Sequence, residues 1–381
     1  MIISREQITM HPLCEYLTEY KELNSGNKYR PVAVGRYGIR TRESIYSKDL
    51  AQDYSKNRLI YKGTLTVGMG SVQMDIGILS DDVVYSVSPA YHTYRISGID
   101  YDYLRFCLQC RNMDMFTRFM KRGSRQGKSI DLDRWIGYEI PVYPREVQLA
   151  IVDRLNRAQH ITDKLQHELD KLDELIKARF VEMFGDPISN SEGLRLVSLK
   201  DVCSKITDGT HDTPPRYQEG YLLITGKNVR PSGLVYDEIE YVCEEDHKII
   251  YARCNPEYGD VLYTNIGVNY GTACFNDLDY EFSMKNVALL KPMKNVITGR
   301  YLWQCLNLMR DHILSMNQVG GAQTFMGLAT IKRIEIPLPA LESQNQFAAF
   351  VTQVDKSKVV VQKALDEAQM LFDSLMQKYF G

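Results

Sequence analysis

The chain contains an internal repeat, and this repeat constrains its architecture more than any other feature. The segment Glu139–Pro144 (EIPVYP) resembles the segment Glu335–Ala340 (EIPLPA), at an offset of 196 residues. At the same offset, with no gap, Phe184-Gly185 aligns with Phe380-Gly381. Self-similarity at a fixed offset indicates copies of one structural unit. We therefore expect two larger units, each followed by a similar tail.

Both tails have the residue spacing of long amphipathic helices. No Pro or Gly interrupts residues 145–184 or 341–380, and apolar residues recur every three or four positions. Each helix is about 60 Å long, because an α-helix rises about 1.5 Å per residue. A polar residue interrupts each apolar seam, at Thr162 and at Lys358. We expect the helices to pack as an antiparallel coiled coil. Its core is predicted to include Leu155, Leu165, Leu169, Leu172, Val351, Val361, Leu365 and Phe372.

The two larger units show the pattern of α+β domains with a mixed or antiparallel sheet. In the second unit, apolar runs bounded by turn residues predict strands at Tyr221–Thr225, Lys248–Tyr251, Asp260–Thr264 and Val287–Leu290, followed by a helix at Tyr301–Met309. The first unit has the same order in degenerate form. The predicted domains are residues 1–138 and 187–334, and the predicted long helices lie within 139–186 and 335–381.

Composition and sequence pattern argue against a membrane-spanning protein, a secreted protein and a closed zinc site. The formal net charge is −2 and apolar residues make up 44% of the chain, which is ordinary for a globular protein. No apolar run is long enough to predict a membrane span, and the N-terminus has no signal-peptide pattern. The eight cysteines are scattered. The single C-x-x-C pair, Cys107 and Cys110, lacks the further ligands of a closed zinc site, so we expect buried thiols in a cytoplasmic protein.

Charge differs between the two predicted domains. Residues 1–138 carry 20 Lys and Arg and 15 Asp and Glu, a net charge of +5, whereas residues 187–334 have a net charge of −2. The first domain is basic enough to suggest a polyanionic partner. The second domain shows no such excess, so charge alone does not indicate nucleic-acid binding.

Known catalytic motifs are absent from the sequence. The segment Gly123–Ser129 (GSRQGKS) has three residues between its glycines, where a phosphate-binding loop needs four. No G-x-S-x-G or H-E-x-x-H motif occurs. His211 lies near Asp208 and Asp212, but no partner nucleophile accompanies it. We therefore expect a chain that performs no chemistry by itself and binds no metal.

Three further segments open the second unit: Leu199–Cys203 (LKDVC), Ile206–Pro214 (ITDGTHDTP) and Leu223–Asn228 (LITGKN). With the duplicated strand–proline–helix junctions at 139–148 and 335–344, they resemble the specificity subunits of type I restriction–modification systems. The resemblance covers nearly the whole chain. Residues 1–45 depart from it, because they lack this opening pattern.

The resemblance implies a function. Each target-recognition domain of such a subunit reads one half of a bipartite, asymmetric site in double-stranded DNA. The helix pair sets the spacer and docks two modification subunits, which bind S-adenosylmethionine and methylate adenine. Restriction subunits, with translocase and nuclease activity, are further partners. The chain itself is then a non-catalytic recognition subunit without a cofactor of its own.

Candidate DNA contacts follow from side-chain chemistry. Arg and Lys bind guanine edges and phosphates, and Asn and Gln pair with adenine. We predict contacts in the polar loops of both domains: Arg36, Arg40, Arg42, Gln73, Arg125, Gln126 and Lys128 in the first, and Thr210, His211, Thr213, Arg216, Lys227, Asn228, Arg230, Gln323 and Thr324 in the second.

Two alternatives stay open. The chain fits equally a specificity subunit of an orphan or other multisubunit methyltransferase that has no nuclease. It also fits an adaptor whose coiled coil binds protein and whose domains do not touch DNA. DNA binding in the presence of methyltransferase partners discriminates the adaptor from the other two.

Overall fold

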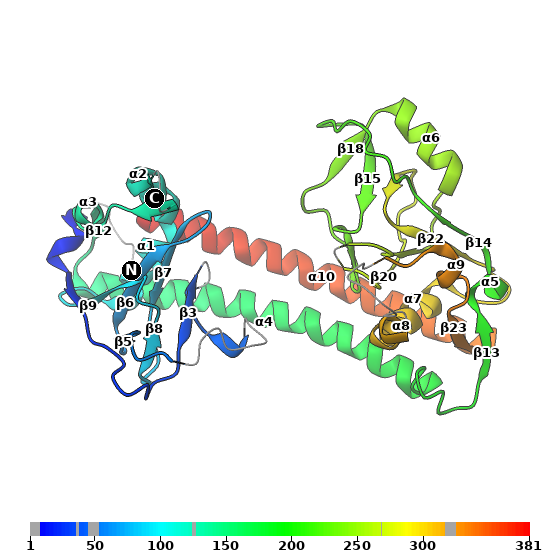
Figure 1. The fold of residues 1–381 in the computed structure, drawn as a ribbon, viewed down its shortest axis with the longest axis horizontal. Helices are drawn as coiled ribbons and strands as arrows, with labels where there is room; N and C mark the ends of the chain where they lie inside the picture. The colour runs from blue at the N-terminus through cyan, green and yellow to red at the C-terminus, as the bar shows by residue number, and fades with distance from the viewer. Residues whose placement is uncertain (1–7, 36–37, 45–52, 124–126, 268, 317–324) are drawn as a thin grey trace. The chain divides into compact units, whose positions relative to one another are not determined.

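The computed structural model describes residues 8–35, 38–44, 53–123, 127–267, 269–316 and 325–381. The chain divides into two compact units (Figure 1). Unit 1 comprises Met1–Leu165 and Ala364–Gly381, and unit 2 comprises Gln166–Lys363. Among the helices of these described ranges, none is long and apolar enough to cross a membrane.

Unit 1 is built on a four-stranded antiparallel sheet in the order β2-β9-β6-β7. These strands are Leu17–Tyr20, His92–Ile96, Thr64–Met69 and Met74–Ile78, respectively. Helices α1 (Tyr101–Cys110), α2 (Asn112–Phe119) and α3 (Leu132–Trp135) share a core with this sheet. Four antiparallel pairs complete the unit: β1 (Thr9–Pro12) with β12 (Glu139–Val142), β3 (Val32–Gly35) with β4 (Gly38–Thr41), β5 (Arg58–Ile60) with β8 (Tyr85–Val87), and β10 (Met120–Gly123) with β11 (Gly127–Ile130).

Unit 2 repeats this plan with a sheet in the order β14-β22-β19-β20, formed by Cys203–Asp208, Ala288–Pro292, Val261–Tyr263 and Ala273–Phe275. Its core also contains α5 (Leu199–Val202), α7 (Gly299–Leu308), α8 (Arg310–Met316) and α9 (Leu328–Ile331). A second sheet has the order β18-β15-β21 (Glu240–Val242, Tyr221–Thr225, Ser283–Lys285), and its β15–β21 pair is parallel. The pairs β13 (Arg195–Ser198) with β23 (Glu335–Leu338) and β16 (Val229–Arg230) with β17 (Gly233–Leu234), together with α6 (Glu244–Cys254), complete the unit.

The two units therefore repeat each other in structure, and the predicted α+β class with mixed and antiparallel sheets is confirmed. Elements β12 and β23 are offset by 196 residues, as are α3 and α9. The opening of unit 1 makes the same main-chain contacts as that of unit 2, although its sequence lacks the motif. The Leu13 N–H donates to the Tyr138 carbonyl at 3.0 Å, and the Leu199 N–H donates to the Ile334 carbonyl at 2.9 Å.

The two expected long helices are α4 (Arg145–Phe184) and α10 (Leu341–Phe380) (Figure 1). In unit 1 the N-terminal half of α4 shares the core with the C-terminal end of α10, and in unit 2 the C-terminal half of α4 shares the core with the N-terminal half of α10. The pairing is therefore antiparallel. Of the predicted helix-core residues, Leu155, Leu169, Val351 and Phe372 are buried, and Leu165, Leu172, Val361 and Leu365 are partly buried.

The polar residue in the α10 seam has a partner in unit 2. Lys358 Nζ lies 2.7 Å from Asp173 Oδ1 of α4. Both side chains are mostly covered, so this pair is less screened by solvent than one at an open surface. The Thr162 hydroxyl of α4 instead donates to the Gln159 carbonyl of its own helix at 2.7 Å.

Each long helix is fixed to its domain by a glutamine near its first turn. In unit 1, Gln148 Oε1 accepts the Asp100 N–H at 3.0 Å, and Gln148 Nε2 donates to the Tyr143 carbonyl at 2.7 Å. Gln148 is 3% exposed. The Tyr103 hydroxyl donates to the Pro141 carbonyl at 2.8 Å. A buried amide keeps such bonds because leaving its groups unpaired costs about 1–3 kcal/mol.

The same arrangement occurs in unit 2. Gln344 Oε1 accepts the Thr298 N–H at 2.8 Å, and its Nε2 donates to the Pro339 carbonyl at 3.0 Å. The Tyr301 hydroxyl donates to the Pro337 carbonyl at 2.7 Å. Gln148 and Gln344 are thus equivalent groups at the two helix starts.

One predicted strand is wrong. Residues Lys248–Tyr251 belong to helix α6. The apolar pair in this run suggested a strand, but His247, Ile250 and Cys254 are the buried residues of the helix and have helical spacing. Glu244, Glu245 and Asp246 lie in the first turn, where acidic side chains are favourable. A short apolar run does not by itself distinguish these two structures.

Candidate nucleic-acid interface

Two predicted residues of unit 2 line one pocket at the ends of β15, β18 and β21. The pocket has a volume of about 270 Å³. Its lining residues are Arg216, Thr225, Gly226, Lys227, Glu238, Glu240, Ile266, Gly267, Lys285 and Asn286. We call this the unit 2 polar pocket. Arg216 and Lys227 are predicted contacts that the structure brings together, although they stand in different loops.

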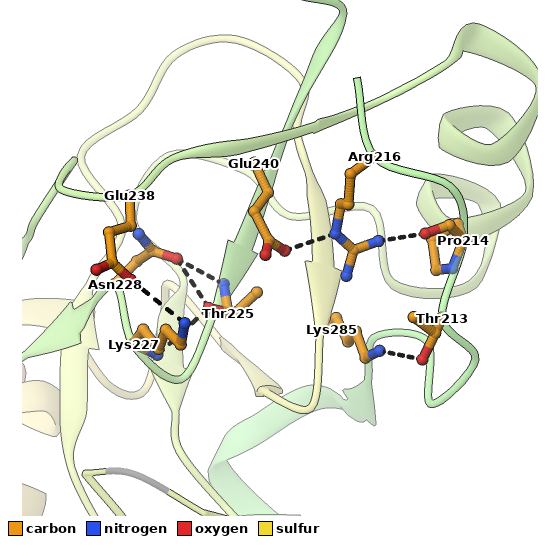
Figure 2. A network of polar contacts seen from close by, with 9 residues as sticks. All are labelled: Thr213, Pro214, Arg216, Thr225, Lys227, Asn228, Glu238, Glu240 and Lys285. Atoms are coloured by element: carbon orange, nitrogen blue, oxygen red, sulfur yellow. Dashed lines mark hydrogen bonds and ion pairs between the residues drawn. The ribbon is translucent and has the colours of Figure 1, made fainter. Parts of the chain in front are cut away.

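Each cation of the unit 2 polar pocket has a side-chain partner. Arg216 Nε donates to Glu240 Oε2 at 2.6 Å, and Lys227 Nζ lies 3.3 Å from Glu238 Oε2. Figure 2 shows these side chains pointing toward their partners. Lys285 Nζ donates to the Thr213 hydroxyl at 2.5 Å. Each cation is thereby held near the protein surface in a defined position.

Asn228 has a structural role that sequence reasoning did not anticipate. Its Oδ1 accepts both the Thr225 N–H and the Thr225 hydroxyl at 3.0 Å, and its Nδ2 donates to the Val235 carbonyl at 3.1 Å. The side chain is 2% exposed. Because its amide is already used inside the protein, Asn228 shapes the turn that carries Lys227.

His211 and Thr210 lie in the loop that follows β14. His211 Nε2 is 2.6 Å from Asp208 Oδ2, and His211 Nδ1 is 3.0 Å from Asn286 Oδ1. The buried Asp208 also accepts from Arg253 Nη2 at 2.6 Å. The Thr210 N–H donates to the Met284 carbonyl at 2.9 Å. These bonds fix a half-exposed imidazole beside the unit 2 polar pocket.

The remaining predictions for unit 2 lie elsewhere. Arg230 is half-buried on β16, and its Nη1 donates to the Val229 carbonyl at 3.2 Å. Gln323 and Thr324 lie outside the described residues.

In unit 1 the structure places Lys128 beside the turn that carries Gln73. Lys128 on β11 reaches the Ser71 carbonyl with its Nζ at 3.4 Å, and Ser71 and Gln73 share the turn between β6 and β7. Arg40 is exposed on β4, and the Arg42 guanidinium lies 5.3 Å from the centre of the Tyr54 ring. Arg36, Arg125 and Gln126 lie outside the described residues.

Sequence reasoning missed most members of the unit 2 polar pocket, among them the polar residues Glu238, Glu240, Lys285 and Asn286. Each is an ordinary polar residue of a turn or strand end in the sequence. Their proximity depends on the parallel pairing of β15 with β21 and on the antiparallel pairing of β15 with β18. Such long-range pairings leave no local signal in the sequence.

The two cysteines of the C-x-x-C pair have the environment of structural thiols, with Cys107 buried and Cys110 partly buried. Cys107 and Cys110 both lie on α1, and Cys107 is completely buried. Burial raises the pKa of Cys107 to about 12, so the thiol is protonated at neutral pH and a poor nucleophile. Within the described residues, no group of three or more His, Cys, Asp and Glu side chains is arranged to hold a metal ion.

The unit 2 polar pocket offers hydrogen-bond donors and acceptors on strand ends and on the loops beside them. Guanidinium and ammonium groups suit phosphate oxygens and guanine edges, and carboxylates accept from the cytosine amino group. This chemistry suits recognition of a polar, charged polymer.

Comparison with known proteins finds a family model that matches the second half of the chain. Residues 192–368 match the model of the type I restriction modification DNA specificity domain. A curated relative, the putative type I restriction enzyme MjaX specificity subunit of Methanocaldococcus jannaschii, is 24% identical over 188 residues. The match covers 48% of this chain and 44% of that relative, so the chain spans less than half of the relative's length.

Solved structures share the fold of the whole chain. The S subunit of a type I restriction–modification system from M. genitalium covers 100% of this chain and 98% of its own, with a TM-score of 0.58 and 15% identity. A chain from a structural study of assembly and conformational transition of the type I R-M system covers 100% and 99%, with a TM-score of 0.52 and 16% identity. At these identities the likeness shows the fold. Residues 192–368 thus match the type I restriction modification DNA specificity domain, and the resemblance of the chain to the specificity subunits of these systems is confirmed.

Proposed function

We propose that the chain is the non-catalytic DNA-specificity subunit of a type I restriction–modification enzyme. The observation that carries this proposal is the DNA specificity domain at 192–368 within a structure that repeats itself. Each of the two recognition domains, 1–138 and 187–334, reads one half of a bipartite DNA site. Two half-domains of different sequence suit a site that is asymmetric in bases and two-part in layout.

The long helices are proposed to set the spacer and to dock two modification subunits. Restriction subunits are further partners, and S-adenosylmethionine is bound by the modification subunits. Several apolar side chains of both helices are exposed, which favours protein partners along them. These residues are Leu149, Ile161, Leu175 and Val181 of α4, and Val359, Val360, Met370 and Leu371 of α10.

A methylome tests the proposal. The chain would be co-expressed with the modification subunit encoded beside it, in a host without DNA methylation. Modified adenine would then be located by single-molecule sequencing. We expect a two-part motif that appears only when this chain is present. A stable complex that methylates no motif would contradict the proposal and favour the coiled-coil adaptor. An orphan methyltransferase is separated from a restriction enzyme by the neighbouring genes.

The predicted contacts can be tested singly. We expect Lys227→Ala to weaken DNA binding by the assembled enzyme and to lower the slope of log affinity against log salt by about 1, because an exposed ammonium contacts phosphates without reading sequence. Binding would be measured by fluorescence anisotropy at several salt concentrations. Lys248→Ala on α6 removes the same charge outside the unit 2 polar pocket and is the matched control. An unchanged slope for Lys227→Ala would remove this residue from the interface.

A further inference from the structure

The carboxylates of the unit 2 polar pocket have a part in specificity, an inference that rests on the proposed function. We propose that Glu238 and Glu240 are specificity-determining residues that compete with DNA phosphates for Lys227 and Arg216. In the unbound chain each carboxylate forms an ion pair with one of these cations. A DNA phosphate takes a cation only by displacing its carboxylate, and the contacts of the correct half-site compensate for that loss.

The first argument is the charge of the pocket. It contains three cationic side chains, Arg216, Lys227 and Lys285, and two of them face carboxylates. Lys285 instead donates to a neutral hydroxyl, that of Thr213. The carboxylates cancel most of the positive charge where DNA would approach, and they repel phosphates. Repulsion of the wrong partner is a recognised source of specificity.

The second argument is the backbone at Glu238. Its φ angle is +52°, in the left-handed region that residues other than Gly, Asn and Asp adopt rarely. The turn before Glu238 is held by Asn228, whose Nδ2 donates to the Val235 carbonyl. The fold therefore maintains an uncommon conformation at the residue whose carboxylate meets Lys227.

The third argument is the position of Glu240. It lies on β18, where it is the register partner of Leu223 of β15. Tyr217 follows Arg216 in the chain, and Tyr241 follows Glu240. These two tyrosines form an antiparallel β-bridge. Strand pairing thus holds both members of the Arg216–Glu240 pair, whose side chains are 28% and 39% exposed. The Lys227–Glu238 pair is more open, at 62% and 79%, so its hold on the cation is weaker.

The test measures binding to a pool of random-sequence duplexes by the full chain in complex with its modification subunit. We expect Glu240→Gln to tighten this binding by up to about ten-fold near 0.1 M salt and to steepen the salt slope by about 0.9, the value for one additional phosphate contact. Glu238→Gln should act in the same direction but less. Glu245→Gln on α6 makes the same change of charge outside the pocket and should have no comparable effect.

A double variant links the gain to the cation. Adding Arg216→Met to Glu240→Gln should abolish most of the gain, because no freed guanidinium remains and only the lost repulsion of phosphates persists. The proposal is overturned if the folded Glu→Gln variants bind random DNA as the unmodified chain does, or if the gain survives Arg216→Met undiminished. Thermal melting checks folding, and the gentler Glu238→Gln change serves if Glu240→Gln does not fold. Failure of the proposed function gives a different result, a complex of the unmodified chain that neither methylates a motif nor binds DNA, and the inference fails with it.

Discussion

Replacing Phe180 by alanine is expected to lower the free energy of unfolding of unit 2 by about 3–5 kcal/mol, the usual cost of removing a buried phenyl ring. Phe180 is completely buried on α4. Its ring stacks on that of Tyr301 of α7, with centroids 5.1 Å apart, and meets the edge of Phe347 of α10 at 5.5 Å. The cavity would therefore open where both long helices meet the domain.

Denaturant unfolding and hydrogen exchange together provide the measurement, because exchange resolves the two units separately. Val181→Ala is the matched control, since the neighbouring Val181 side chain is 45% exposed and surface changes of this kind stay within about 0.5 kcal/mol. A Phe180→Ala protein with unchanged protection in unit 2 would show that the aromatic cluster does not join these helices.

Asp260→Ala is expected to destabilise unit 2 by about 3–5 kcal/mol, because it leaves a buried cation without its closest partner. Asp260 precedes β19, and its Oδ2 lies 2.8 Å from Nζ of Lys291 on the adjacent strand β22. Both side chains are about nine-tenths buried. Burial raises the pKa of Asp260, and the ammonium of Lys291 opposes that rise. Glu257, 3.1 Å from Lys291 Nζ, retains part of the compensation.

A variant that lacks both charges shows whether the cost of Asp260→Ala comes from the unpaired ammonium or from the loss of the aspartate side chain itself. Asp260→Ala combined with Lys291→Met should be more stable than Asp260→Ala alone, because no buried charge then lacks a partner. Urea unfolding of the unmodified chain, the single variants and the double variant completes the cycle. A double variant that is no more stable than Asp260→Ala would show that the ammonium is solvated in spite of its burial.

The long helices were predictable because their signal is local and repeated. Spacing of three and four residues over forty positions is the direct imprint of helix geometry, and α4 and α10 begin and end where the uninterrupted pattern does. The strand Tyr221–Thr225 was predicted with its observed bounds. The run Lys248–Tyr251 was too short for its period to be decided from sequence.

The candidate site was less predictable, because its members meet only through tertiary pairing. Arg216 and Lys227 were chosen for side-chain chemistry, and that choice says nothing about Glu240 or Glu238 beside them. Asn228 has the right chemistry for reading adenine, but the fold uses its amide within a turn. The residues predicted to contact DNA therefore remain predictions, and those within the described ranges now have defined surroundings.

The glutamine and tyrosine bonds at the helix starts have a consequence for how such proteins diversify. Gln148, Tyr103, Gln344 and Tyr301 bond to main-chain groups of their own unit. Because every residue except proline offers the same main-chain N–H and every residue the same carbonyl, these joints tolerate sequence change in the domains they anchor. Under the proposed function, a domain of new sequence, and so of new DNA target, keeps the same attachment to the long helices.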